Sequence, residues 1–358
     1  MFFVVFLLLA LGALAVKNNL KYYDLAVIVF ACILTYFGEN VADFDNYENV
    51  YNIISLGSVY TDIGLGWYYL CRVGAFLGLN YLQFKVLIIF LSFLLIRGTV
   101  NYYIKGQRAR IILWGVVLLY PTLIELVQVR FLLGEAVTIY ALRFLNRRDF
   151  KNTVIYLIFV VGAYIIHSAC AFYLLFVLVG IFEKIKKLLA VFVVFLSAFI
   201  FFGKSIIIKM ASMILNSARV ERYFSFDDGM GLLGFTAYFF TLFLFLSVSK
   251  RLVKMGTDPA LSLSVEERGF LNLIHQLNML STLLLPLSMF DTNIFRLQRI
   301  MWPLLYMGMM LLYSKGVRDI VLYRIRIKLK AVCAITALCG LVVYICIFNF
   351  NIIESFLL

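Results

Sequence analysis

The sequence predicts an all-α, polytopic integral membrane protein that forms a single transmembrane domain over residues 1–358. Two observations predict this class. The chain is 64% hydrophobic and 14% charged, whereas a soluble domain is nearer half apolar and a quarter charged. Its apolar residues gather in solid runs of roughly 15–20 residues, the length that a helix needs to cross a bilayer, and not in the short alternating segments of a barrel. A soluble enzyme and a nucleic-acid-binding module are thereby excluded.

The apolar runs predict about twelve membrane-spanning helices. They cover residues 2–16, 24–38, 83–104, 111–127, 130–145, 153–166, 168–182, 188–203, 234–249, 270–289, 300–314 and 331–350. The first run follows no basic stretch and contains no small-residue cleavage pattern, so we expect a retained helix and not a signal peptide. A shorter apolar piece, residues 65–79, carries glycine and predicts a short interfacial helix within a long outer loop near residues 39–82. A second outer loop is expected near residues 204–234.

The basic residues predict which side of the membrane each connection faces. A net charge of +13 suggests nucleic acid in a soluble protein, but in a membrane protein lysine and arginine mark the cytoplasmic connections. Alternate connections carry most of them: Lys17 and Lys21; Arg97, Lys105, Arg108 and Arg110; Arg143, Arg147, Arg148 and Lys151; Lys184, Lys186 and Lys187; Lys250, Arg251, Lys254 and Arg268; and Lys315, Arg318, Arg324, Arg326, Lys328 and Lys330. This pattern places both termini outside and needs no nucleic-acid partner. The cations left on the outer side are Arg72, Lys85, Arg130, Lys204, Lys209, Arg219, Arg222, Arg296 and Arg299.

The sequence carries no motif for a metal or another cofactor. Its six cysteines lie within or near apolar runs without CxxC spacing, as expected of small packing residues and not of disulfides or metal ligands. Walker, GxGxxG and HExxH motifs are missing, and the longest predicted cytoplasmic connection, residues 250–269, is too short for a nucleotide-binding domain. We therefore expect no cofactor and no metal.

Arg130 and Glu135 are charged residues at the start of an apolar run. Charge within a membrane segment is costly unless it is paired or functional. Arg130 either extends toward lipid headgroups or faces a cavity lined by protein. Glu135 needs a partner, and Arg130 is the nearest cation in sequence although their spacing is not an ideal helical pair. A purely structural role for Glu135 is equally open.

Arg296 and Arg299 lie three residues apart in the outer connection 290–299, so on a helix they share one face. A guanidinium is always charged and binds phosphate through two parallel hydrogen bonds. Two of them on one face are suited to clamp a diphosphate. The alternative is an interfacial pair that touches lipid headgroups.

His167 lies at the predicted outer turn between two spans. A lone histidine at such a turn is most often a hydrogen-bonded structural residue. Its outer position also makes it a candidate general base or sugar ligand. The other histidine, His275, is expected to be a polar packing residue between helices.

The first outer loop combines acidic and aromatic residues, among them Asp43, Tyr47 and Tyr51. Aromatic rings stack on the apolar face of a sugar while carboxylates hold its hydroxyl groups, so this pattern favours sugar binding. An aromatic belt at the membrane interface is the alternative.

Taken together, these segments resemble the EpsG-like branch of the Wzy-type polysaccharide polymerases over most of the chain. The resemblance rests on Asp43-Phe44-x-x-Tyr47-x-x-x-Tyr51, Asp62-x-Gly64-x-Gly66-Trp67-Tyr68, Arg130 followed by Glu135-Ala136, His167-Ser168-Ala169 and Arg296-x-x-Arg299. The chain departs from the family pattern at Asp62, where glutamate is commoner, and at Gly134-Glu135, which stand in a stretch that is usually small and apolar.

The resemblance implies an enzyme that joins oligosaccharide repeat units of O-antigen, capsule or exopolysaccharide at the outer face of the bacterial inner membrane. The donor would be an oligosaccharide linked to undecaprenyl diphosphate, and partners would include membrane lipid, a chain-length regulator and a flippase. Its implied chemistry is metal-independent attack of an acceptor hydroxyl, with the lipid diphosphate as leaving group. The diphosphates would bind Arg130, Arg296 and Arg299, and His167 would deprotonate or orient the acceptor. Asp43, Tyr47, Tyr51, Arg72 and Glu135 complete the expected substrate site.

Two rivals remain at this stage. A flippase or transporter of lipid-linked oligosaccharide also suits twelve helices and outer cations, although no internal repeat is visible. An O-antigen ligase shares the lipid-diphosphate donor and differs mainly in its acceptor. A membrane acyltransferase is disfavoured because its histidine would stand early in the chain, and the first histidine here is His167.

Overall fold

The computed structural model is all-helical over the described residues, which confirms the all-α part of the predicted fold class. The structure describes residues 2–15, 22–37, 44–58, 63–202, 206, 209, 212–213, 231–289, 294–315 and 320–348, and these ranges contain no strand.

The helices follow the predicted apolar runs closely. In order they are α1 (Phe2–Ala15), α2 (Tyr23–Phe37), α3 (Phe44–Ser55), α4 (Leu65–Phe76), α5 (Tyr81–Tyr103), α6 (Gln107–Val117), η1 (Leu118–Thr122), α7 (Leu123–Val127), α8 (Val129–Leu145), α9 (Phe150–Ile166), η2 (Ser168–Leu178), α10 (Val179–Lys184), α11 (Lys186–Phe202), α14 (Gly231–Gly256), η3 (Pro259–Leu261), α15 (Val265–Leu280), η4 (Ser281–Leu284), η5 (Pro286–Met289), α16 (Phe295–Arg299), α17 (Met301–Lys315) and α18 (Ile320–Phe348). The run at 270–289 differs from the prediction, because α15 ends at Leu280 and short 3-10 turns follow it.

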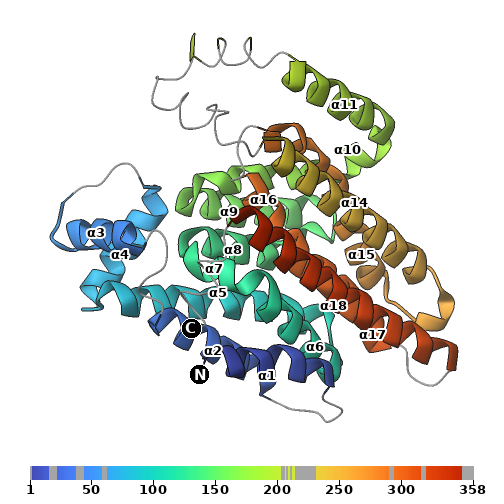
Figure 1. Ribbon diagram of the computed structural model, residues 1–358, viewed down its shortest axis with the longest axis horizontal. Coiled ribbons are helices and arrows are strands. Elements are labelled where there is room, and N and C mark those ends of the chain that lie inside the picture. Colours follow the sequence, from blue (N-terminus) through green and yellow to red (C-terminus); the bar gives the residue numbers. More distant parts are fainter. Residues whose placement is uncertain are drawn as a thin grey trace.

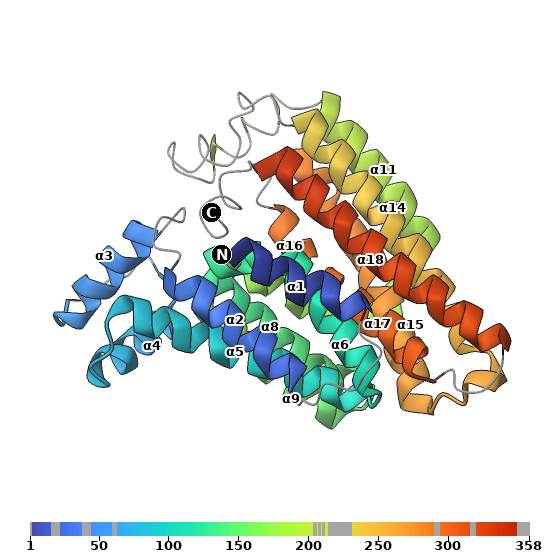
Figure 2. The ribbon, with the colours of Figure 1, turned by 60° about the horizontal axis from the view of Figure 1, so that its bottom comes forward.

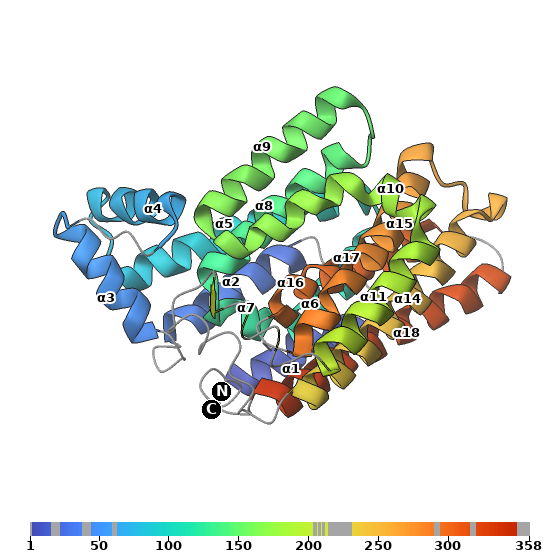
Figure 3. The same ribbon diagram turned by 90° about the horizontal axis from the view of Figure 1, so that it is seen from above.

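The helices form two groups that meet along one seam. One group contains α1, α2, α5, α6, α8 and α9, and the other contains α11, α14, α15, α17 and α18 (Figures 1 and 2). The seam is made by α6 against α17 and by η1 against α18. The short helix α16 lies at this seam (Figure 3) and packs on η2 and α17. The seam is therefore where residues from both halves of the chain come together.

Several of these helices are long and apolar enough to cross a membrane. Within the described residues, three qualify by length and composition: Tyr81–Tyr103, Gln107–Val127 and Gly234–Gly256. Shorter apolar helices are Val4–Ala15, Tyr23–Phe37, Phe150–Ile166, Ser168–Ile181 and Lys187–Phe199. The chain is thus helical with membrane-spanning character, and the number of twelve spans stays a prediction.

The stretch from Gln107 to Val127 is not a regular helix. The backbone of Tyr120 is extended (φ −161°, ψ 130°) next to Pro121, which has no N–H to donate, and the chain breaks again at Gln128 (φ −101°, ψ 55°). Irregular backbone at membrane depth is tolerated only where protein or a water-filled cavity covers it. Here protein does, because every residue of η1 and α7 is buried. The two breaks leave α7 as a short interior helix that carries Glu125.

The first outer loop holds two helices where the sequence predicted one. The predicted interfacial helix at 65–79 is α4, and α3 precedes it (Figure 1). Helix α3 buries Val50, Tyr51 and Ile54 on one face, and this i, i+1, i+4 spacing is typical of an amphipathic helix. The acidic and amide residues of α3 made its amphipathic pattern hard to detect in the sequence. Most of the second loop, 204–234, lies outside the described residues.

The starts of α5 and α8 lie at the same end of the molecule. Late in both helices, Thr99 Oγ1 donates to the Ile139 carbonyl at 3.2 Å. Just beyond them, Asn146 Nδ2 donates to Tyr103 Oη at 3.2 Å. Tyr103 follows Thr99 in the chain, and its partner Asn146 likewise follows Ile139. The two helices therefore run in the same direction. The end where they start is called the arginine end below, and the opposite end holds the turn after α8.

Candidate functional site

A buried ion pair joins the two halves of the chain at the arginine end. Arg299, from α16, places its Nε 3.0 Å from Glu125 Oε1 of α7, and both side chains are almost fully buried. Its guanidinium also donates to Gln128 Oε1 at 2.6 Å and lies 5.2 Å from the ring centre of Phe131. The two breaks that isolate α7 therefore place a carboxylate and an amide around one arginine.

A second buried carboxyl group, that of Glu135, belongs to the same cluster. Tyr173 of η2 donates its hydroxyl to Glu135 Oε1 at 3.3 Å, and Glu135 interacts electrostatically with both Glu125 and Arg299. Gly134 permits this approach, because a Cβ there would collide with the Cys170 sulfur of η2. One guanidinium faces two carboxyl groups, so the group carries net negative charge whenever both are ionised.

His167 lies beside this cluster in the turn between α9 and η2, as the sequence predicted. Its Nδ1 accepts a hydrogen bond from the backbone N–H of Ala169 at 3.2 Å, so the neutral ring carries its proton on Nε2. Burial, reinforced by three nearby guanidinium groups, lowers the pKa of His167 from 6.5 to about 3. Those groups are the side chains of Arg130, Arg296 and Arg299. His167 is therefore a neutral hydrogen-bond donor at physiological pH and a poor base.

The structure thus brings together the residues that the sequence singled out for diphosphate binding. Arg130, Arg296 and Arg299 all lie close enough to His167 to interact with it electrostatically, although they come from α8 and α16, which are far apart in the chain. We call these four residues the arginine cluster. Arg130 is half-buried with its guanidinium 5.8 Å from the ring centre of Tyr47 in α3. Tyr47 is the outer-loop residue that the structure places against the cluster.

Several buried polar atoms of this region lack an aligned hydrogen-bond partner among the described residues. They are both carboxylate oxygens of Glu125, the Nε atoms of Arg130 and Arg299, and the Nε2 of Gln298. Buried polar groups are almost always hydrogen-bonded to protein or water. Glu125 and Arg299 face each other in the ion pair, so the donors that lie outside it are the Nε of Arg130 and the Nε2 of Gln298. These two N–H donors are suited to the oxygens of an anionic ligand.

Two glycines of the first outer loop fix the turn that carries His167. A Cβ on Gly64 would collide with the Ile165 carbonyl oxygen, and one on Gly66 would lie 3.0–3.1 Å from Ile165 and Ile166. The start of α4 therefore lies directly on the end of α9, one residue before His167. The Gly-x-Gly segment seen in the sequence has a packing role at the edge of the site.

Three of the predicted substrate residues lie apart from the cluster or outside the described ranges. Tyr51 is buried, donates to the Leu79 carbonyl at 2.7 Å and stacks on Phe84, an environment of packing and not of substrate contact. Arg72 is exposed and donates to the Ile54 carbonyl at 3.2 Å, which ties α4 to the end of α3. Asp43 lies outside the described residues.

The sequence-based list of site residues missed Glu125, Gln128, Tyr173 and Gln298. Glu125 carried a usable signal, because a carboxylate inside an apolar run is costly and rarely without function. The other three had none. Gln128 enters the site through a backbone break, and Tyr173 and Gln298 enter through contacts between distant segments. Among the described residues, no group of three or more histidine, cysteine, aspartate or glutamate side chains is placed to hold a metal ion.

The fold and the site define a helical membrane protein that gathers cations and carboxylates at one end of its bundle. Comparison with protein families identifies this class more closely: the chain matches the EpsG family over residues 20–355 and belongs to it. Membership indicates a membrane protein related to polysaccharide polymerases. Comparisons with curated proteins and with solved structures find no match.

The buried pair between Arg299 and Glu125 predicts a specific stability pattern. Arg299→Gln leaves buried carboxylates without their cation, and we expect a loss of about 3–5 kcal/mol, as for other buried pairs broken on one side. The double variant Arg299→Gln/Glu125→Gln removes one of these charges as well and is expected to unfold at a higher temperature than the single variant. Thermal unfolding of detergent-purified protein measures both effects. A single variant as stable as the unmodified protein, or a double variant no better than the single, would contradict the pairing.

Proposed function

We propose that this protein is a glycosyltransferase that joins oligosaccharide repeat units carried on undecaprenyl diphosphate into a longer polysaccharide. The observation that carries the proposal is the arginine cluster, in which three guanidinium groups from two distant helices lie near one neutral histidine. Guanidinium groups bind the oxygens of a diphosphate in pairs and stabilise the charge that develops as it leaves. Membership in the EpsG family supports the same class of reaction.

The proposed step is a single displacement at the donor sugar. An acceptor hydroxyl oxygen forms a bond to the anomeric carbon, the bond from that carbon to the diphosphate oxygen breaks, and the diphosphate departs with the electron pair. The hydroxyl proton passes to a base. Arg130, Arg296 and Arg299 hold the diphosphate and balance its increasing negative charge.

The geometry favours one of the two roles suggested for His167. Its Nδ1 is occupied by the Ala169 N–H and its pKa is about 3, so it is a weak base whose Nε2–H is available for donation. We assign it to orient a substrate oxygen. The proton is better accepted by a carboxylate, and Glu125 and Glu135 are the ones that lie beside the arginines.

An apolar groove supports a lipid-linked substrate. It has a volume of about 460 Å³ and lies between the end of α2 and the start of α5, which is the arginine end of the molecule. Its lining is almost wholly hydrocarbon: Val29, Cys32, Ile33, Tyr36, Phe37, Gln83, Val86, Leu87 and Phe90. This surface is suited to a polyprenyl tail.

The charge pattern of the sequence supports an orientation for this site. If the basic connections are cytoplasmic, the arginine end faces outward in the twelve-span arrangement, and polymerisation takes place on the outer face of the bacterial inner membrane. A flippase would then deliver the donor from the inner side, and a chain-length regulator would be the natural partner for a growing polymer.

Loss of single arginines tests the proposal in cells. Arg296→Ala and Arg130→Ala each remove a cation that is not part of the buried Glu125 pair, so we expect full-length expression, roughly a hundredfold less long-chain polymer and an accumulation of single lipid-linked repeats. Arg251→Ala, at an exposed position in α14, serves as the matched control and should leave polymer length unchanged. Electrophoresis of extracted polysaccharide gives the readout.

The same experiment separates the rival functions. Normal polymer from both well-expressed variants would refute the assignment. Purified protein that adds repeats only to a lipid core acts as a ligase, and purified protein that moves the lipid-linked repeat across vesicles without forming a longer product acts as a flippase.

The role of His167 predicts a pH dependence and a rescue. Because the pKa of His167 is about 3, the ring stays neutral above pH 5, and His167 itself should contribute no inflection near pH 6.5 to the rate of polymerisation. His167→Gln keeps an N–H donor and should retain more turnover than His167→Ala. Turnover measured between pH 5.5 and 8 checks both points. An inflection near pH 6.5 that disappears in the glutamine variant would instead make His167 the base.

A further inference from the structure

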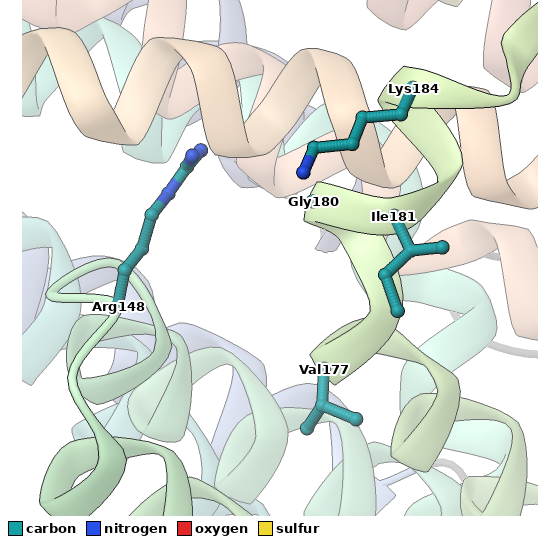
Figure 4. A pocket seen from close by; sticks show the side chains of 5 residues that line it. All are labelled: Arg148, Val177, Gly180, Ile181 and Lys184. Atoms are coloured by element: carbon teal, nitrogen blue, oxygen red, sulfur yellow. The ribbon is translucent and has the colours of Figure 1, made fainter.

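A second cationic feature lies at the opposite end of the bundle from the arginine cluster. There a cavity of about 520 Å³ is lined by Arg148, Val177, Gly180, Ile181 and Lys184. Arg148 approaches it from the turn after α8, and Lys184 from the end of α10, so that both side chains point toward the hollow (Figure 4). Neither residue has a part in the proposed polymerisation.

The two sites are separated by the length of a helix. Arg148 stands just before α9 (Phe150–Ile166), and His167 follows directly after it. A helix of 17 residues rises about 25 Å. The cavity is thus distinct from the arginine cluster and lies on the side that the charge pattern predicts to be cytoplasmic.

Arg148 is held in place before any ligand binds. Its backbone is in the left-handed region (φ 59°), which is uncommon for a residue other than glycine. Its guanidinium donates to Gln276 Oε1 of α15 at 2.8 Å, and Gln276 is itself buried. The neighbouring Asp149 accepts hydrogen bonds from the backbone and side chain of Asn152 at 2.8 and 2.6 Å. That carboxylate is therefore committed to the start of α9.

The charge of the cavity is not balanced by the protein where the structure describes it. The ion pairs among the side chains that the structure describes are Arg97–Asp24, Arg147–Glu266, Arg299–Glu125 and Lys315–Glu267, and none involves Arg148 or Lys184. Two cations at one hollow, one of them fixed by a hydrogen bond, favour an anion with several oxygen acceptors.

The remaining wall of the cavity is apolar, and the following helix, α11, exposes hydrocarbon side chains. Val177 and Ile181 line it, and Gly180 leaves the backbone open, with no atom within 4 Å of the position of a Cβ. Beyond Ile181, which is 56% exposed, Leu188 and Val191 of α11 are also exposed. A small inorganic anion gains nothing from such a wall, whereas a lipid places its phosphate on the cations and its acyl chains along the apolar residues.

We propose that this cavity binds the headgroup of an anionic phospholipid, with its phosphate held between Arg148 and Lys184. The expected ligand class is a phosphodiester lipid such as phosphatidylglycerol. The site is independent of the proposed polymerase reaction, since it uses other residues at the other end of the bundle.

Lipid binding by the purified full-length protein tests this site. Native mass spectrometry counts phosphatidylglycerol retained from mixed phosphatidylglycerol and phosphatidylcholine micelles. We expect Arg148→Gln/Lys184→Gln to lower phosphatidylglycerol retention at least roughly tenfold. The control Lys187→Gln/Arg251→Gln removes the same charge from exposed positions outside the cavity and should stay within about twofold of the unmodified protein.

The remaining outcomes are equally decisive. Equal losses in the two double variants would show that net charge alone attracts the lipid and would overturn the site. Displacement of the lipid by millimolar inorganic phosphate would assign the cations to a free phosphate instead. If the first double variant does not fold, Lys184→Gln alone, at an exposed position, must still lower retention for the proposal to stand.

Discussion

The burial of Arg299 is the constraint on which the rest of the site depends. A guanidinium cannot lose its charge in a protein and is costly to remove from water, so its surroundings must supply acceptors. Glu125 and Gln128 provide them, and both are available only because the backbone breaks on either side of α7. The irregular segment thus positions both acceptors, and α16 brings the arginine to them at the seam between the two helix groups.

Around this pair the protein separates two kinds of cation. Arg299 is bound to protein groups, while Arg130 lies over the aromatic face of Tyr47 and keeps a buried Nε without an aligned partner in the described part of the chain. The first kind fixes geometry and the second is available to a ligand. Gly64 and Gly66 also contribute to this arrangement. They let α4 pack against the turn that carries His167, while the Nε2–H of His167 stays available.

Local sequence patterns predict the helices and the outer arginines, but they do not predict which residues come into contact. Apolar runs locate the helices because a helix satisfies its own backbone hydrogen bonds within hydrocarbon. Arg130, Arg296 and Arg299 stand out because a charge near a membrane segment is costly unless it is paired or functional. Local patterns do not reveal which residues meet. Tyr51 stands in a segment whose composition favours sugar binding, yet its ring packs on Phe84. Gln128 stands in a segment that resembles a solvated turn, yet its side chain binds Arg299. Those outcomes depend on long-range packing, which periodicity does not record.

Binding of a lipid diphosphate by the arginine cluster can be measured directly. Affinity of purified protein for undecaprenyl diphosphate, without any sugar, isolates this step from catalysis and from transport. We expect Arg296→Ala and Arg130→Ala each to weaken binding by roughly tenfold or more, whereas Arg251→Ala should bind as the unmodified protein does. Equal affinity in all four proteins would contradict binding at the cluster.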